Sequence, residues 1–177
     1  MKTYEIVIKK HKEITGDEIA SLILLKQQYW KYDYESQLHW LKENLLPEDI
    51  HIFVRSKEGL LAYLNLVNVQ VEMDSKVWTM IGIGNVCVSK ENKHTGMGLI
   101  LMAQANALIR ELKLEGILLC KRELSAFYEL SGWEKMNIQE VIINNIPFYD
   151  YVMILKDRRK KSGQFEGGFR LLLNRNF

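Results

Sequence analysis

The chain has 177 residues, enough to bury about two-thirds of its unfolded surface around one hydrophobic core. Hydrophobic residues make up 47% and charged residues 26%, as in ordinary globular proteins, and the net charge of +2 gives no reason to expect nucleic acid. The first residues lack an apolar signal core, and no stretch approaches the ~18 apolar residues of a membrane helix. We therefore expect a cytoplasmic protein without a membrane partner.

The amino-terminal part predicts one strand and two helices. Residues 3–9 alternate apolar and polar side chains, as a half-exposed edge strand does. Thr15 to Glu18 has the T-x-x-E pattern of a capping box, which predicts a helix over Asp17–Tyr32. A second helix is expected over Glu35–Leu46, stopped by Pro47.

Four aromatic residues crowd the end of the first predicted helix. They are Tyr29, Trp30, Tyr32 and Tyr34, more rings than one helical face can bury. Core packing remains the alternative for each ring, but the cluster is a candidate wall of a ligand site.

Three apolar segments then predict an antiparallel meander, over His51–Arg55, Leu60–Val71 and Val77–Val88. The turn between the first two ends in Gly59, which can adopt a positive φ. Cys87 lies in the third segment and Cys120 in a later one. Thiols at such positions are typical of small core hydrophobes, so we expect neither a disulfide nor a metal site, consistent with a reducing compartment.

The segment Gly82–Ile109 reads as a strand, a polar turn with two glycines, and a long helix. Lys93–Gly98 contains no carboxylate, and its glycines allow main-chain N–H groups to point outward at the helix start, which favours an anion. A plain tight connection is the alternative. The Walker loop does not fit, because Leu99 follows Gly98 where Lys is required, and neither does the dinucleotide fingerprint.

The helix after this turn shows one apolar stripe: Met97, Leu101, Ala105, Leu108 and Leu112, with small Ala103, Ala105 and Ala107 allowing close packing. Gly116–Cys120 has no charge and should be a strand parallel to Ile83–Ser89 by the crossover rule. If these strands splay, the cleft between them lies beside the glycine turn.

The last part predicts a short helix over Ser125–Trp133 capped by Gly132, and a hairpin of Ile138–Asn144 with Phe148–Leu155. Residues 156–161 carry five bases and one acid, which usually means a solvated tail. The apolar Phe169–Leu173 would add an edge strand or dock on a partner, and a homodimer is left open.

Two motifs resemble those of the GNAT superfamily of N-acetyltransferases. The acetyl-CoA loop of that family, Q/R-x-x-G-x-G/A after a V-x-P strand end, is matched at Val88, Gly96 and Gly98, with Lys93 in place of Arg or Gln and Lys90 in place of Pro. Ser125–Trp133 resembles the family's A-x-x-F-Y-x-x-x-G-F/W signature. The resemblance covers Val77–Leu155. Within the superfamily, the sequence most resembles the aminoglycoside 2'-N-acetyltransferases.

This resemblance implies an α/β (α+β) GNAT fold: a mixed, mostly antiparallel sheet of six to seven strands, splayed at its parallel junction, with helices on both faces. Residues 1–156 would form the domain and 157–177 a basic extension. It also implies acetyl-CoA as co-substrate. Pantetheine would lie along Val86, Cys87 and Val88, and the pyrophosphate on Lys93, His94, Thr95, Gly96, Met97, Gly98 and Leu99.

By the same resemblance, Tyr128 would protonate the departing thiolate while a small primary amine takes the acetyl group directly. The acceptor would be walled by Tyr29, Trp30, Tyr32 and Tyr34 together with Glu72 and Asp74. The central strand has Gly82, Gly84 and Asn85 where related enzymes carry an acid, so the base is left open between water, Glu72, Asp74 and a terminal carboxylate. A non-catalytic acyl-CoA sensor or interaction module on the same fold is the alternative.

Overall fold

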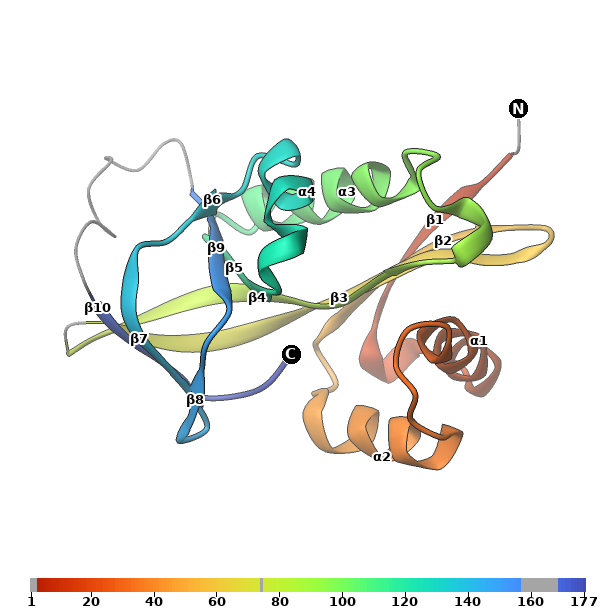
Figure 1. Cartoon of the computed structure of the whole chain (residues 1–177). Coiled ribbons are helices and arrows are strands. Elements are labelled where there is room, and N and C mark those ends of the chain that lie inside the picture. The colour runs from red at the N-terminus through yellow and green to blue at the C-terminus, as the bar shows by residue number, and fades with distance from the viewer. Residues whose placement is uncertain (1–2, 74, 157–168) are drawn as a thin grey trace. The chain divides into compact units, whose positions relative to one another are not determined.

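The computed structural model describes residues 3–73, 75–156 and 169–177. They form an α+β protein with four α-helices and a mixed, mostly antiparallel sheet of ten strands, more than the six to seven expected (Figure 1). The chain divides into two compact units. The first unit comprises residues 3–67, 84–105 and 177, and the second comprises the described parts of 68–83 and 106–176. Strands β3 (Gly59–Met73) and β4 (Lys76–Val88) and helix α3 (Met97–Glu111) each contribute to both.

Strand β1 (Glu5–Lys10) pairs with β2 (Ile50–Ser56) in the first unit, and β2 pairs with the beginning of β3, both antiparallel. They are the edge strand that the alternation predicted and the first two strands of the predicted meander. Gly59 has φ of 135°, which confirms the positive φ expected at the turn between β2 and β3. In Figure 1 helices α1 and α2 lie on one side of these strands and the start of α3 on the other.

Helix α1 (Gly16–Gln27) follows a 3₁₀ turn over His11–Glu13 and begins with the predicted capping box. The Glu18 N–H donates to Thr15 Oγ1 at 3.3 Å, and the Thr15 N–H donates to Glu18 Oε2 at 2.9 Å. The prediction that this helix reaches Tyr32 is wrong. Its last turn closes when the N–H groups of Tyr29 and Trp30 both donate to the oxygen of Lys26.

Helix α2 (Tyr34–Asn44) starts where the sequence offers a better N-cap than the aromatic run does. The carboxylate of Asp33 accepts from the Ser36 N–H at 2.7 Å, and an N-cap residue must itself leave the helical conformation. The chain from Tyr29 to Asp33 is therefore a turn and a connection between two helices.

The strands of the second unit follow the order β6-β9-β5-β4-β3-β10-β7-β8. Their bounds are β5 Gly116–Cys120, β6 Glu134–Lys135, β7 Ile138–Ile143, β8 Ile146–Phe148, β9 Tyr151–Leu155 and β10 Phe169–Leu173. Strands β4 and β5 are parallel, as predicted, with Ile81 opposite Gly116 and Ile83 opposite Leu118. Whether they splay beyond Ile83 stays a prediction, because Gly84–Val88 belong to the first unit.

Two predictions about the carboxyl-terminal strands are wrong. Strand β7 pairs with the short β8 through a turn at Asn144 and Asn145, whose φ angles are 48° and 65°, whereas β9 pairs with β5 and β6. Asparagine tolerates the left-handed conformation of such a tight turn, so the hairpin closes earlier than expected. Strand β10 lies between β3 and β7 and is not an edge strand. Residues 157–168 lie outside the described residues, so the domain boundary at 156 stays a prediction.

The buried face of α3 differs from the predicted stripe. Leu101, Ala105 and Ile109 are buried, but Leu112 is 47% exposed and Ala103 and Ala107 face solvent. The shift includes a polar residue: Asn106 is buried because it accepts from Trp133 Nε1 at 2.9 Å and donates to the Ser131 oxygen at 2.7 Å.

Helix α4 (Ser125–Leu130), preceded by a 3₁₀ turn over Arg122–Leu124, is the predicted short helix, and Gly132 ends it with φ of 86°. Trp133 is 2% exposed and lies in the core. A side chain at Gly116 would meet the Trp133 ring at 2.6 Å, so this glycine makes room for the tryptophan. No helix among the described residues combines the length and hydrophobicity that crossing a membrane requires.

Candidate cofactor-binding site and its surroundings

The segment between β4 and α3 presents a row of free main-chain N–H groups. A 3₁₀ turn over Lys90–Asn92 leads into residues with positive φ, 61° at His94 and 87° at Gly96. After Lys93, the next main-chain N–H with a main-chain acceptor is that of Ile100, which donates to the Gly96 oxygen at 3.1 Å. Within the described part of the chain, the N–H groups of Thr95–Leu99 have no main-chain acceptor. A helix start with free N–H groups attracts anions.

Hydrogen bonds within the first unit hold this segment in place. Asn92 donates to Ser89 Oγ and Thr95 Oγ1 donates to the Asn92 oxygen, both at 2.7 Å. The Lys90 N–H donates to Gln28 Oε1 at 2.8 Å, which ties the turn to the end of α1. The Ser89 N–H donates to the Leu61 oxygen at 2.7 Å, which ties it to β3. The N–H row is therefore organised by the protein itself.

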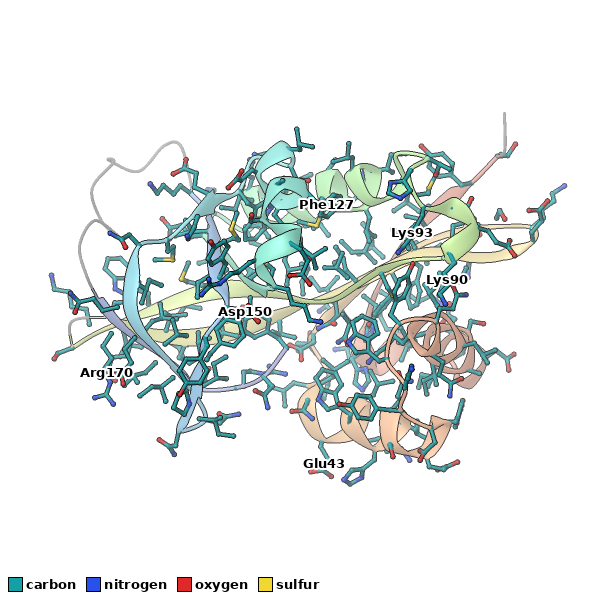
Figure 2. The ribbon with its side chains drawn as sticks, viewed as in Figure 1. Glu43, Lys90, Lys93, Phe127, Asp150 and Arg170 are labelled. Atoms are coloured by element: carbon teal, nitrogen blue, oxygen red, sulfur yellow. The ribbon has the colours of Figure 1, made fainter. Side chains whose placement is uncertain are left out.

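The side chains of the predicted cofactor residues leave this row open. Lys93, His94, Thr95 and Gly96 are exposed, and Lys90 and Lys93 project from the segment (Figure 2). On β4, Val86 and Val88 are half-buried and Cys87 is buried. Burial raises the pKa of the Cys87 thiol to about 12, so the thiol stays neutral and is a poor nucleophile.

A polar cluster interrupts β4 just before the predicted cofactor strand, and sequence reasoning missed it. Asn85 has φ of 52° and donates to Asn65 Oδ1 at 2.7 Å. Asn65 is fully buried and its Nδ2 has no partner among the described residues. A side chain at Gly84 would meet the main-chain carbon of Phe177 at 2.2 Å. Glycines beside an asparagine inside a strand were the available signal, since they mark bulges and close approaches of another backbone.

The four predicted wall aromatics have different surroundings, although the rings of Tyr29 and Trp30 meet edge to face at 6.1 Å between centroids. The Tyr29 hydroxyl donates to the Val88 oxygen at 2.5 Å, and the Lys93 ammonium lies 4.9 Å from the centre of the Tyr29 ring. Trp30 instead flanks Lys26. Tyr32 is 63% exposed and Tyr34 is the first residue of α2. Tyr29 is thus the ring that contacts the predicted cofactor segment directly.

Two further predicted site residues, Tyr128 and Glu72, belong to the second unit. Tyr128 is buried with its ring edge-on to Phe127, at 5.0 Å between centroids. Burial raises the pKa of the Tyr128 phenol well above its ordinary value. Glu72 is exposed, and Asp74 lies outside the described residues. Their convergence with the loop of the first unit stays a prediction.

No family model matches the sequence, and no curated protein sequence matches it. Solved structures do. The chain is 18% identical to Escherichia coli ElaA, with a TM-score of 0.65 over 87% of this chain and 100% of that one. It is 15% identical to the E. coli GNAT family N-acetyltransferase YhbS in complex with CoA, with a TM-score of 0.68 over 96% of this chain and 91% of that one. It is 13% identical to an aminoglycoside 6'-N-acetyltransferase complexed with coenzyme A, with a TM-score of 0.63 over 84% and 96%.

These similarities show that the chain has the GNAT fold, as the two sequence motifs predicted. They do not support the finer resemblance to the 2' subtype, because the aminoglycoside enzyme among them is a 6' enzyme.

Proposed function

We propose that the protein is an acetyl-CoA-dependent N-acetyltransferase that moves an acetyl group to the primary amine of a small polar acceptor. The observation that carries this proposal is the row of unpaired N–H groups from Thr95 to Leu99 at the start of α3, in a chain with the GNAT fold. Two proteins with similar structures were solved with CoA.

In this proposal the pyrophosphate accepts hydrogen bonds from the N–H row, and pantetheine runs along Val86, Cys87 and Val88. Main-chain donors do not depend on the side chain, so Lys93 can stand where the family pattern has Arg or Gln. Lysine cannot make the two parallel hydrogen bonds that the guanidinium group of an arginine would give to a phosphate. The Lys93 ammonium lies over the Tyr29 ring and the Lys93 N–H donates to the Lys90 oxygen at 3.4 Å, so the free main-chain donors come from the residues that follow Lys93.

The chemistry is direct transfer. The neutral amine attacks the thioester carbonyl, a C–N bond forms, the C–S bond breaks, and the N–H of Val88 or a neighbour polarises the carbonyl oxygen. Tyr128 would give its proton to the departing thiolate. The phenol is protonated at neutral pH, but burial raises its pKa and makes it a weaker acid, so this role requires the thiolate to lie within hydrogen-bond reach of the hydroxyl. The proton of the attacking amine would leave through water, Glu72, Asp74 or a terminal carboxylate.

The acceptor proposal rests on aromatic and acidic side chains that suit an ammonium group, namely Tyr29, Trp30, Tyr32 and Tyr34 with Glu72 and Asp74. Aminoglycosides, polyamines and peptide amino termini all present such a group.

A panel assay tests the function. Purified protein is incubated with acetyl-CoA and each amine, and free thiol is measured. Thiol release with an amine, together with a mass increase of that amine, supports the enzyme. Transfer only to hydrophobic acceptors would contradict the aromatic and acidic wall.

One observation favours a second candidate, a sensor that binds acyl-CoA without turnover. The described residues of β4 offer Gly82, Gly84 and Asn85 but no carboxylate after Lys76 that could take the amine's proton. Calorimetric binding of CoA without thiol release for any amine would select this candidate over the enzyme.

A further inference from the structure

Lys26 is a buried lysine in the last turn of α1, enclosed by two tryptophans. The residue is 5% exposed, and its ammonium lies 4.7 Å from the ring centre of Trp40 and 5.8 Å from that of Trp30. Within the described part of the chain no carboxylate lies within ion-pair distance of it. A lysine this buried is normally paired with an acid.

The surroundings of Lys26 favour its neutral amine. Burial lowers the pKa of Lys26 to about 8, and the nearby Cys87 thiol stays neutral because its own pKa is raised to about 12. At pH 7 the neutral, nucleophilic fraction of Lys26 is therefore about two orders of magnitude larger than that of an ordinary lysine. An exposed lysine such as Lys42 on α2 has no such environment.

Lys26 also lies next to the predicted cofactor segment, within the same unit. Tyr29, one turn further on, donates to the Val88 oxygen at 2.5 Å and lies under the Lys93 ammonium. Gln28 accepts from the Lys90 N–H at 2.8 Å. The end of α1 is thus fastened to both β4 and the glycine turn.

We propose that Lys26 is an acylation site of the protein itself, and that an acyl-CoA held by Val86–Val88 and the N–H row of Thr95–Leu99 is the donor. The Nζ lone pair attacks the thioester carbonyl, the N–C bond forms and the C–S bond breaks. The thiolate leaves and takes up the proton that nitrogen loses, giving an amide on Lys26 and free CoA thiol. This step rests on the acyl-CoA-binding part of the proposed function and does not need the acceptor amine.

The environment between the two tryptophans suits acylated Lys26 as well as the free lysine. An amide on Lys26 carries no charge, so it removes the cost of keeping a cation without an acidic partner. It also removes a positive charge beside Trp30, a residue of the proposed acceptor wall. Acylation of Lys26 would change that wall for a cationic acceptor, whereas a lysine that only packs between two rings would stay unmodified.

Site-resolved mass spectrometry tests the proposal on the full chain. The protein is incubated with acetyl-CoA at pH 7.5, cleaved with a protease that spares lysine, and the acetylated fraction of Lys26 is followed against that of Lys42. Lys26 should be labelled about tenfold faster or more, because its neutral fraction is larger. Excess CoA should suppress labelling of Lys26 and leave Lys42 unaffected, and Gly96→Glu should do the same. Lys26→Arg should lose this label alone.

Calorimetry with CoA on the same sample separates the possible failures. CoA binding without preferential labelling of Lys26 overturns the acylation site and leaves the proposed function standing. Labelling of Lys26 that is no faster than that of Lys42, or that CoA does not suppress, overturns it as well. Absence of CoA binding overturns both proposals, since the donor site would not exist.

Discussion

The hydroxyl of Tyr29 donates a 2.5 Å hydrogen bond to the main-chain oxygen of Val88. This bond fastens the turn after α1 to the end of β4, immediately before the glycine turn that is proposed to hold the pyrophosphate. The aromatic segment is therefore linked to the predicted cofactor strand by a specific contact. Substitutions at Tyr29 should change the affinity for CoA.

Replacing Tyr29 by Phe removes this hydrogen bond and leaves the Val88 oxygen without its donor. We expect a loss of about 1 kcal/mol in the free energy of unfolding and a several-fold weaker affinity for CoA. Urea denaturation and calorimetry measure the two effects. Tyr32→Phe is the matched control, because Tyr32 is 63% exposed. Equal behaviour of the two variants would show that the bond to Val88 has no such role.

Replacing Gly84 by Ala places a methyl group 2.2 Å from the main-chain carbon of Phe177, so one of the two must move. We expect destabilisation of about 1–3 kcal/mol, as for other insertions into packed sites. Gly16→Ala is the control. Gly16 lies in the first turn of α1 with open space around it, and alanine there should stabilise by up to about 1 kcal/mol. A neutral Gly84→Ala variant would mean that Phe177 does not pack there in solution.

Capping and turn signals were readable from the sequence because they depend on neighbouring residues. The Thr15–Glu18 capping box and the positive φ of Gly59 and Gly132 needed only local information. The place of β10 between β3 and β7 did not, since nothing near Phe169 states which strand will pair with it. The buried face of α3 was misjudged for a similar reason. Asn106 looks like a surface residue until its bonds to Trp133 and Ser131 are known.

In the candidate site, too, features encoded in neighbouring residues could be predicted, and features that depend on distant contacts could not. The glycine turn was found because an anion-binding helix start is encoded in consecutive residues. Lys26 and Trp40 were missed because packing brings them together from α1 and α2, and Asn65 was missed because its partner Asn85 comes from another strand. The aromatic run at Tyr29 was noticed, but its role as a tie to Val88 depends on a contact across 59 positions of sequence.

Replacing Lys26 by Met should change how stability depends on pH. The pKa of Lys26 is lowered to about 8 in the folded protein from 10.5, so the unfolded chain binds the proton more tightly. Below about pH 8, Lys26 is protonated in both the folded and the unfolded state. The folded state is then destabilised by the full free energy of burying the ammonium group. As pH rises from about 8 to 10.5, wild type should gain up to about 3 kcal/mol that the variant does not gain.

The measurement is the difference in unfolding free energy between wild type and Lys26→Met across pH 7 to 11. Other titrating groups cancel in this difference. A difference that is constant over the whole range would show that the pKa of Lys26 is ordinary in the folded protein.

Replacing Tyr128 by Phe should lower turnover by about a hundredfold if the phenol protonates the thiolate, while CoA affinity stays nearly unchanged. Phe127→Leu is the matched control on the neighbouring position. Steady-state thiol release with the best acceptor, together with calorimetry of CoA, separates chemistry from binding. Unaltered turnover of Tyr128→Phe across pH would assign this residue to packing alone.

Calorimetric titration of CoA into wild type, Gly96→Ala and Gly96→Glu tests the central claim most directly. Gly96 has φ of 87° and open space around its Cα, so alanine introduces backbone strain, and glutamate adds a negative charge against the pyrophosphate. We expect that wild type binds CoA, that Gly96→Ala binds it more weakly, and that Gly96→Glu does not bind it. No heat with wild type, or equal affinity of wild type and Gly96→Glu, would contradict the assignment of the cofactor to the N–H row of Thr95–Leu99.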